Sequence, residues 1–210
     1  MTDTTQIKDL SKVIEVLEGK CQENPDSIMA HHHLGLVYRH AGRHEDAIRE
    51  LNRALEIDEH SAETLINLGA IYFELNRLDE AMAANKKAVV YAFNPAQAHT
   101  NIGLIHQRLG DAQKAIDSYL KAVDHNKNLA FAWVNLASAQ VMAGNFSEAI
   151  KAADKSIELD PGMAMAHNNK AVALFYNKEA HAAKESINKA IELGYKVDPR
   201  FIEAVNQELS

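Results

Sequence analysis

The sequence has a single cysteine, Cys21, which excludes a framework of internal disulfides. It has no run of four Lys or Arg residues and carries a net charge of −7, so it lacks the basic surface that nucleic-acid binding needs. No apolar stretch approaches the roughly 18 to 20 residues of a membrane span. The first residues also lack the basic and then apolar pattern of a signal peptide. We therefore expect a cytoplasmic protein with no membrane span and no nucleic-acid partner.

The sequence does contain a repeat with a fixed step of 34 residues. Each interval holds two segments with helical apolar periodicity, joined by a turn that is marked by Gly42, Asn76, Gly110 or Gly144 in the first four intervals. One helix pair cannot bury its apolar face alone, so such pairs must stack on their neighbours. The step is marked by an alanine near the start of each second helix: Ala47, Ala81, Ala115, Ala149 and Ala183.

The repeats predict a simple organisation of the chain. Residues 1–27 predict one amphipathic helix that looks like the second half of a repeat whose first half is missing. Five intervals follow without insertion: 28–61, 62–95, 96–129, 130–163 and 164–197. Residues 198–210 predict a last helix, started by Asp198 and Pro199, that would cover the open end of the stack.

Small and bulky residues recur at the same positions of these intervals, for example Leu34, Gly35 and Tyr38 in the first, Leu68, Gly69 and Tyr72 in the second, and Trp133, Leu136, Ala137, Ala149 and Pro161 in the fourth. In this pattern the five intervals resemble tetratricopeptide repeats. The resemblance implies an all-α, right-handed superhelical solenoid of antiparallel helix pairs. The sequence departs from the family pattern at Asn85, Ser156 and Lys170, where we expect weaker local packing.

The resemblance also implies that one face of each first helix lines a concave, ligand-binding groove. The sixth position of the intervals reads His33, Asn67, Asn101, Asn135 and Asn169. A side-chain amide both donates and accepts hydrogen bonds, so this ladder could bind the backbone of an extended peptide. The alternative is that the amides make hydrogen bonds between helices.

The same face becomes more apolar toward the C-terminal half of the chain. Exposed apolar surface of this kind usually marks an interaction site. The alternative is that the last helix covers much of it. The candidate anchors and neighbouring contacts, beside the ladder, are Phe73, Arg108, Phe131, Met142, Phe175 and Tyr176.

The run His31-His32-His33 raises the question of a metal site, since imidazole binds zinc and nickel. We expect no cysteine or carboxylate to complete a closed site beside it. No Ser or Cys nucleophile comes with a base and an orienting partner, and the glycines fall at repeat positions. The sequence therefore predicts neither an enzyme nor a cofactor.

Two functions remain. The first is a non-enzymatic adaptor or scaffold that holds an extended or helical peptide segment of a partner protein in its groove. The second is a self-assembling scaffold, a homo-oligomer in which the N-terminal helix docks into a neighbour's groove. The N-terminal helix could equally pack on its own first repeat.

Overall fold

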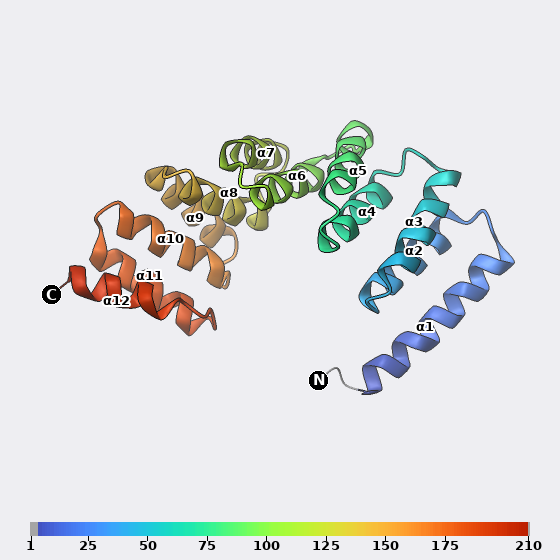
Figure 1. The fold of residues 1–210 in the computed structure, drawn as a ribbon, viewed down its shortest axis with the longest axis horizontal. Coiled ribbons are helices and arrows are strands. Elements are labelled where there is room, and N and C mark those ends of the chain that lie inside the picture. The colour runs from blue at the N-terminus through green and yellow to red at the C-terminus, as the bar shows by residue number, and fades with distance from the viewer. Residues whose placement is uncertain (1–3, 210) are drawn as a thin grey trace. The chain divides into compact units, whose positions relative to one another are not determined.

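The computed structural model describes residues 4–209, and it is all helical over that range (Figure 1). None of the described helices is long and apolar enough to cross a membrane. The helices, in order, are α1 Thr4–Glu23, α2 Ile28–His40, α3 His44–Ile57, α4 Ala62–Glu74, α5 Leu78–Tyr91, α6 Ala96–Arg108, α7 Ala112–His125, α8 Ala130–Met142, α9 Phe146–Leu159, α10 Ala164–Tyr176, α11 Ala180–Glu192 and α12 Pro199–Glu208. Each predicted interval contains two of them.

The chain divides into two compact bodies. The N-terminal body ends at Asn101 and the C-terminal body begins at Ile102, within α6. In the N-terminal body α1 packs on α2, α2 on α3, and α4 on both α3 and α5. In the C-terminal body α8 packs on α7, α9 and α10, and α10 packs on α9 and α11. Within each body, packing therefore joins helices that are close neighbours along the chain.

The turns within the helix pairs use a left-handed backbone, as the turn residues predict. Gly42, Gly110 and Gly144 have φ between 73° and 78°, and Asn76 has φ of 58°. Glycine and asparagine tolerate this conformation because the first lacks a Cβ and the second can bond locally. The fifth turn places Lys178 at φ of 68°, a position without a glycine or asparagine signal in the sequence.

Small residues allow the two helices of a pair to approach closely. A Cβ built on Gly35 of α2 would lie 2.7 Å from Leu51 Cγ of α3. A Cβ on Gly69 would collide with Asn85, and one on Gly103 would collide with the ring of Tyr119. The side chains opposite these glycines are themselves fully buried. At these three crossings the absence of a side chain on the first helix is therefore what allows the close approach.

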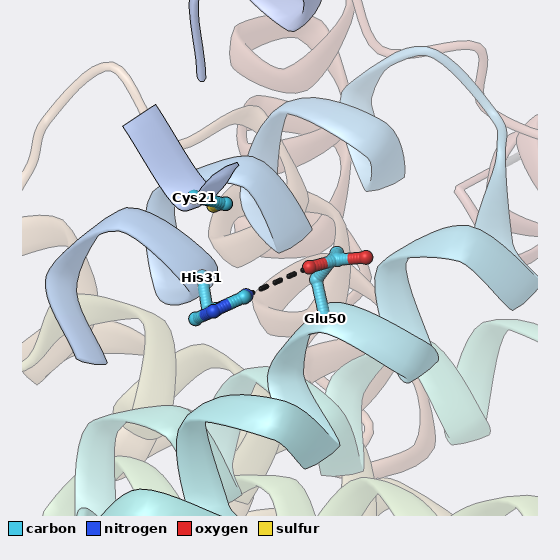
Figure 2. A group of neighbouring side chains, drawn as sticks. All are labelled: Cys21, His31 and Glu50. Carbon is cyan, nitrogen blue, oxygen red and sulfur yellow. Dashed lines mark hydrogen bonds and ion pairs between the residues drawn. The ribbon is translucent and has the colours of Figure 1, made fainter. Parts of the chain in front are cut away.

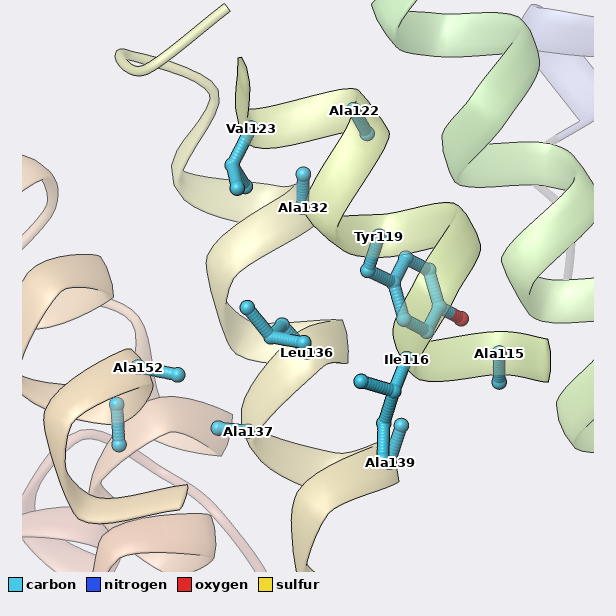
Figure 3. Packing of buried hydrophobic residues seen from close by; sticks show 11 residues of the cluster. Ala115, Ile116, Tyr119, Ala122, Val123, Ala132, Leu136, Ala137, Ala139 and Ala152 are labelled. Atoms are coloured by element: carbon cyan, nitrogen blue, oxygen red, sulfur yellow. The ribbon is translucent and has the colours of Figure 1, made fainter. Parts of the chain in front are cut away.

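Alanines and a few large side chains fill the core between the helix pairs. Figure 3 shows one such cluster in the C-terminal body, where Tyr119 of α7, Leu136 of α8 and Ala152 of α9 come together. The marker residues Ala115 and Ala149 have no exposed surface. Interiors packed at this density leave little room for an added atom.

Asn85 is a departure from the repeat pattern whose surroundings compensate for its polarity. It is fully buried, its Nδ2 donates to the carbonyl of Ala81 (2.8 Å), and its Oδ1 accepts from Nδ2 of Asn101 (2.9 Å). A buried amide with these partners avoids the cost of an unpaired polar group.

The helices at the two ends of the chain pack on their neighbours. In α1, Ile14 and Cys21 are buried against α2, and Tyr38 of α2 donates a hydrogen bond from its hydroxyl to Glu18. Burial, with help from Glu18, raises the pKa of Tyr38 to about 12. At the other end, Val205 of α12 is buried in the cluster formed with α10 and α11. The N-terminal helix therefore packs on the first repeat of its own chain.

A pair of glycine substitutions tests the close approach of the helices. Gly103→Ala should lower stability by about 1–3 kcal/mol, because the added methyl meets the ring of Tyr119. Gly19→Ala is the matched control. No atom lies within 4 Å of its built Cβ, so helix propensity alone should raise stability by about 0.5–1 kcal/mol. Thermal unfolding measures both, and shifts of the same sign would contradict the assignment.

Candidate functional site

Two neighbouring helices of the C-terminal body present matching stripes of side chains. On α8 the stripe is Phe131, Asn135, Ser138 and Met142, and on α10 it is Met165, Asn169, Val172 and Tyr176. Spacings of four, three and four residues place each set on one side of its helix. Because α8 packs beside α10, the two stripes belong to one surface, which we call the α8–α10 face.

The α8–α10 face is uncharged and has three exposed apolar side chains, while its other residues are half-buried or buried. The exposed fractions of Phe131, Met142 and Tyr176 are 45%, 50% and 55%. The ring of Tyr176 stacks on Phe146 of α9, with centroids 5.0 Å apart and planes inclined by 15°. None of the eight side chains carries a charge. Large exposed apolar side chains on one surface are typical of an interaction site.

Asn135 lies at the middle of the α8 stripe and has an unsatisfied donor. Its exposed fraction is 5%, and its Nδ2 has no hydrogen-bond partner. A buried donor without an acceptor costs about 1–3 kcal/mol, so such groups are rare in folded proteins. If another molecule brought a hydrogen-bond acceptor to Asn135 Nδ2, the new hydrogen bond would recover that free-energy cost.

Two other asparagines of the ladder make hydrogen bonds between helices. Asn169 Nδ2 donates to the carbonyl of Val134 on α8 (3.1 Å). Asn101 Nδ2 donates to Asn85, and Asn101 Oδ1 accepts from Gln97 Nε2 (3.1 Å). At these positions the structure shows the interhelical role that the sequence left open beside peptide binding.

In the N-terminal body Asn67 bonds to a buried histidine of the preceding repeat. Asn67 Nδ2 lies 3.4 Å from His32 Nε2, and His32 Nδ1 lies 2.8 Å from Thr64 Oγ1. An amide nitrogen can only donate, so we assign the neutral tautomer in which Nε2 accepts and Nδ1 donates to Thr64. Burial lowers the pKa of His32 below its ordinary value of 6.5; Glu63 opposes this shift and His33 adds to it.

The remaining candidate residues differ in exposure. His33 and Arg108 are exposed, and Phe73 is half-buried. Arg39 and Glu74 join the first helices of the first two repeats through a bidentate ion pair, with Arg39 Nε 3.2 Å from each oxygen of Glu74. That part of the N-terminal body is therefore charged, unlike the α8–α10 face.

Phe175 does not belong to the α8–α10 face. It lies one residue before Tyr176, and its ring packs edge-on against Phe201 of α12, with centroids 5.6 Å apart. It joins the core cluster around Val205 as a partly buried residue. The last helix therefore covers Phe175, one of the expected anchors, and leaves Tyr176 exposed.

A cysteine and a carboxylate lie beside the first histidine of the run, although the sequence led us to expect that neither would complete a closed site there. Cys21 of α1, His31 of α2 and Glu50 of α3 bring one ligand-type atom each to within 4.8 Å of one another (Figure 2). His31 and Glu50 occupy positions that face each other within a helix pair, and Cys21 enters from the N-terminal helix. The residues next to each histidine in the sequence do not indicate this cluster, because its three members come from three different helices.

The chain was compared with protein families, curated sequences and solved structures. The profile described as Tetratricopeptide repeat matches residues 26–89 and 94–161, and a second profile with that description matches residues 134–194. The search of curated protein sequences returned no significant match.

Solved structures similar to the chain include a crystal structure of MamA, with 28% identity and a TM-score of 0.68 over 76% of this chain and 94% of that one. YrrB, described as a TPR protein with an unusual peptide-binding site, has 22% identity and a TM-score of 0.69 over 94% of this chain and 100% of its own. PilF of Pseudomonas aeruginosa has 18% identity and a TM-score of 0.81 over 97% and 92% of the two chains. These likenesses support the all-α helical repeat fold.

The environment of His32 predicts a pH dependence of stability. Its pKa is lowered in the folded state, so the unfolded chain binds a proton that the folded chain does not as the pH falls below 6.5. The contribution of neutral His32 to the free energy of unfolding is therefore complete above pH 6.5. It is lost as the pH falls from 6.5 toward the pKa of His32 in the folded protein. His32→Gln should flatten the acid side of the curve of unfolding free energy against pH.

The control for that measurement is His40→Gln, which alters an exposed histidine of the same helix. Urea unfolding between about pH 5 and 8, the range in which histidine titrates, would give the two profiles. Parallel profiles for wild type and His32→Gln would contradict the prediction.

Proposed function

Because the chain belongs to the tetratricopeptide repeat family, we propose that it is a non-enzymatic adaptor that binds an extended peptide segment of a partner protein. The α8–α10 face is the main contact surface in this proposal. The cytoplasmic location expected from the sequence is part of the same proposal. Family and fold supply the general class of function, and the chemistry of the face supplies the kind of ligand.

The observation that carries the proposal is the unpaired, buried amide nitrogen of Asn135, which lies in a stripe whose end residues Phe131 and Met142 are exposed. Neighbouring ladder residues use their amide nitrogens inside the protein, as Asn169 does with Val134. Asn135 retains a donor that a peptide carbonyl could satisfy after a small local adjustment. A backbone carbonyl is present in every residue of a peptide, so this contact binds an extended chain without reading its sequence.

The other side chains of the face would determine which peptides bind. Phe131, Met142 and Tyr176 offer apolar surface to large apolar side chains of the ligand, and methionine adapts well to different shapes. The absence of charge among the eight residues of the face disfavours a strongly charged ligand, because desolvated charges would find no counterpart there. We therefore propose an uncharged or weakly charged peptide with at least two large apolar side chains.

Five further candidates, on α2, α4 and α6, belong to the same proposal. His33 and Asn67 occupy the equivalent positions of α2 and α4, Asn101 and Arg108 lie on α6, and Phe73 lies on α4. Their role in peptide binding stays a prediction. Asn67 and Asn101 already bond within the protein, so we expect them to contribute less than Asn135.

A second candidate function is self-assembly through α1. Ile14 and Cys21 of α1 are buried, but Val13 and Val16 remain exposed on the same helix. The helix therefore has apolar side chains that its own chain does not cover. A second copy of the chain would be the partner for these side chains.

Two asparagine variants test the adaptor function. Asn135→Ala should leave the melting temperature near that of the wild type, because the packing it loses is offset by removal of an unpaired donor. It should weaken peptide binding roughly 2- to 10-fold, the effect of one neutral hydrogen bond. Asn169→Ala is the matched variant and should lower stability by about 1 kcal/mol, because it breaks the bond to Val134.

The probe is a set of peptides selected from a random library on the full chain and measured by fluorescence anisotropy. Phe131→Ala with Met142→Ala should weaken binding further. Leu120→Ala is the control, since Leu120 is an exposed apolar residue of α7 outside the α8–α10 face. If the peptides bind all of these variants equally, the ligand does not bind at the α8–α10 face.

Sedimentation velocity over a range of concentrations tests self-assembly. The double substitution Val13→Glu and Val16→Glu changes only exposed positions of α1, so the fold should be retained. If α1 mediates assembly, the wild type should form larger species as concentration rises and the variant should remain monomeric. A wild type that is monomeric at all concentrations rejects this candidate.

A further inference from the structure

Cys21, His31 and Glu50 form a compact cluster at the junction of α1, α2 and α3 (Figure 2). One atom of each residue, a sulfur, a ring nitrogen or a carboxylate oxygen, lies within 4.8 Å of the others. The exposed fractions of Cys21 and His31 are 9% and 7%, and the side chain of Glu50 is 13% exposed. The cluster is therefore largely shielded from water. This shielding strengthens the electrostatic interactions among its three side chains.

The hydrogen bond on the far side of His31 orients the ring toward the cluster. His31 Nε2 lies 3.1 Å from the carbonyl oxygen of Pro25, and a carbonyl can only accept. Nε2 therefore carries a proton, and in the neutral ring Nδ1 presents its lone pair. Histidines that bind metals usually donate their other ring N–H to a backbone carbonyl or a carboxylate in this way.

The carboxylate of Glu50 is also oriented by a hydrogen bond from a residue outside the cluster. Arg49 Nε donates to Glu50 Oε1 (3.2 Å), and Glu50 Oε2 lies 2.8 Å from His31 Nδ1. The guanidinium of Arg49 also pairs with Asp46 (2.7 Å), so its positive charge is partly neutralised outside the cluster. The two oxygens of Glu50 thus have separate roles, and Oε2 is directed inward.

With His31 in this tautomer, Nδ1 and Glu50 Oε2 present lone pairs to each other across 2.8 Å. A positive species must lie between them. In the free protein one proton suffices. Cys21 Sγ lies within 4.8 Å of both atoms and adds a third possible metal ligand, which a proton shared by two atoms does not use.

We propose that Cys21, His31 and Glu50 bind a divalent transition-metal ion of the zinc class. Thiolate, imidazole and carboxylate are all ligands of Zn²⁺, with bonds of about 2.0–2.3 Å, so the ligand atoms of a tetrahedral site lie about 3.3–3.8 Å apart. To reach that spacing, the distance of 2.8 Å between His31 Nδ1 and Glu50 Oε2 must widen on binding, and any separation near the 4.8 Å limit must shorten. Three protein ligands leave the fourth position to water.

The bound ion replaces protons at two places. The proton between His31 and Glu50 leaves, and the thiol of Cys21 becomes a thiolate. Burial, together with the carboxylates of Glu50 and Glu18, raises the pKa of the Cys21 thiol in the free protein, so the ion must displace that proton on binding. Once bound, the ion ties the N-terminal helix to both helices of the first repeat.

Cobalt is a suitable probe because it substitutes for zinc and its thiolate complexes absorb light. Cys21 is the only cysteine, so a sulfur-to-cobalt charge-transfer band in the near ultraviolet can arise only from this residue. Cobalt titration of the full chain, without a histidine tag, should give a band that saturates at one ion per chain. Zinc should then abolish the band and raise the melting temperature.

Three variants separate this site from other causes of metal binding. Cys21→Ala should lose the band, and Glu50→Gln, which retains Cys21, should weaken cobalt binding about tenfold or more. His33→Gln with His40→Gln should leave the band and the affinity unchanged, since these exposed histidines lie outside the cluster. Melting curves without metal show that each variant folds. No band at stoichiometric cobalt, or full affinity in Glu50→Gln, would overturn the proposal.

Discussion

The close contact between the two helices of a repeat is the constraint on which the remaining structure depends. At Gly35, Gly69 and Gly103 the second helix presses a side chain against the backbone of the first, at a distance that excludes even a methyl group. This spacing determines how far each first helix turns toward its neighbours. It therefore also determines which side chains face other helices and which remain exposed.

The asparagines of the ladder show the consequence. They occupy the same position of the repeat, yet Asn169 reaches a carbonyl of α8, Asn101 reaches a side chain of α5, and the amide nitrogen of Asn135 reaches no acceptor. Identical residues thus obtain different roles from small differences in their surroundings. The unpaired nitrogen of Asn135 and the exposed apolar residues of the same stripe are the basis on which we propose that a ligand binds there.

The sequence predicted the repeat, the helices and the small residues at the crossings, because these follow from periodic patterns and side-chain volume. It did not predict which asparagines bond within the protein, since that depends on how closely and at what angle neighbouring helices pack. The sequence suggests that Phe175 is exposed, but in the structure its ring packs against Phe201 of α12. The cluster of Cys21, His31 and Glu50 escapes a linear reading because its members come from three helices.

The packing of each helix on its close neighbours has a consequence for synthesis on the ribosome. Within each body the contacts join helices at most two elements apart, so a helix pair can begin to pack soon after it emerges. Ile14 and Cys21 of α1 are buried in a cluster with residues of α2 and α3, so their burial must wait until those helices have emerged. During that interval these two side chains are not yet covered by α2 and α3, which is when a nascent chain is most open to non-native apolar contacts.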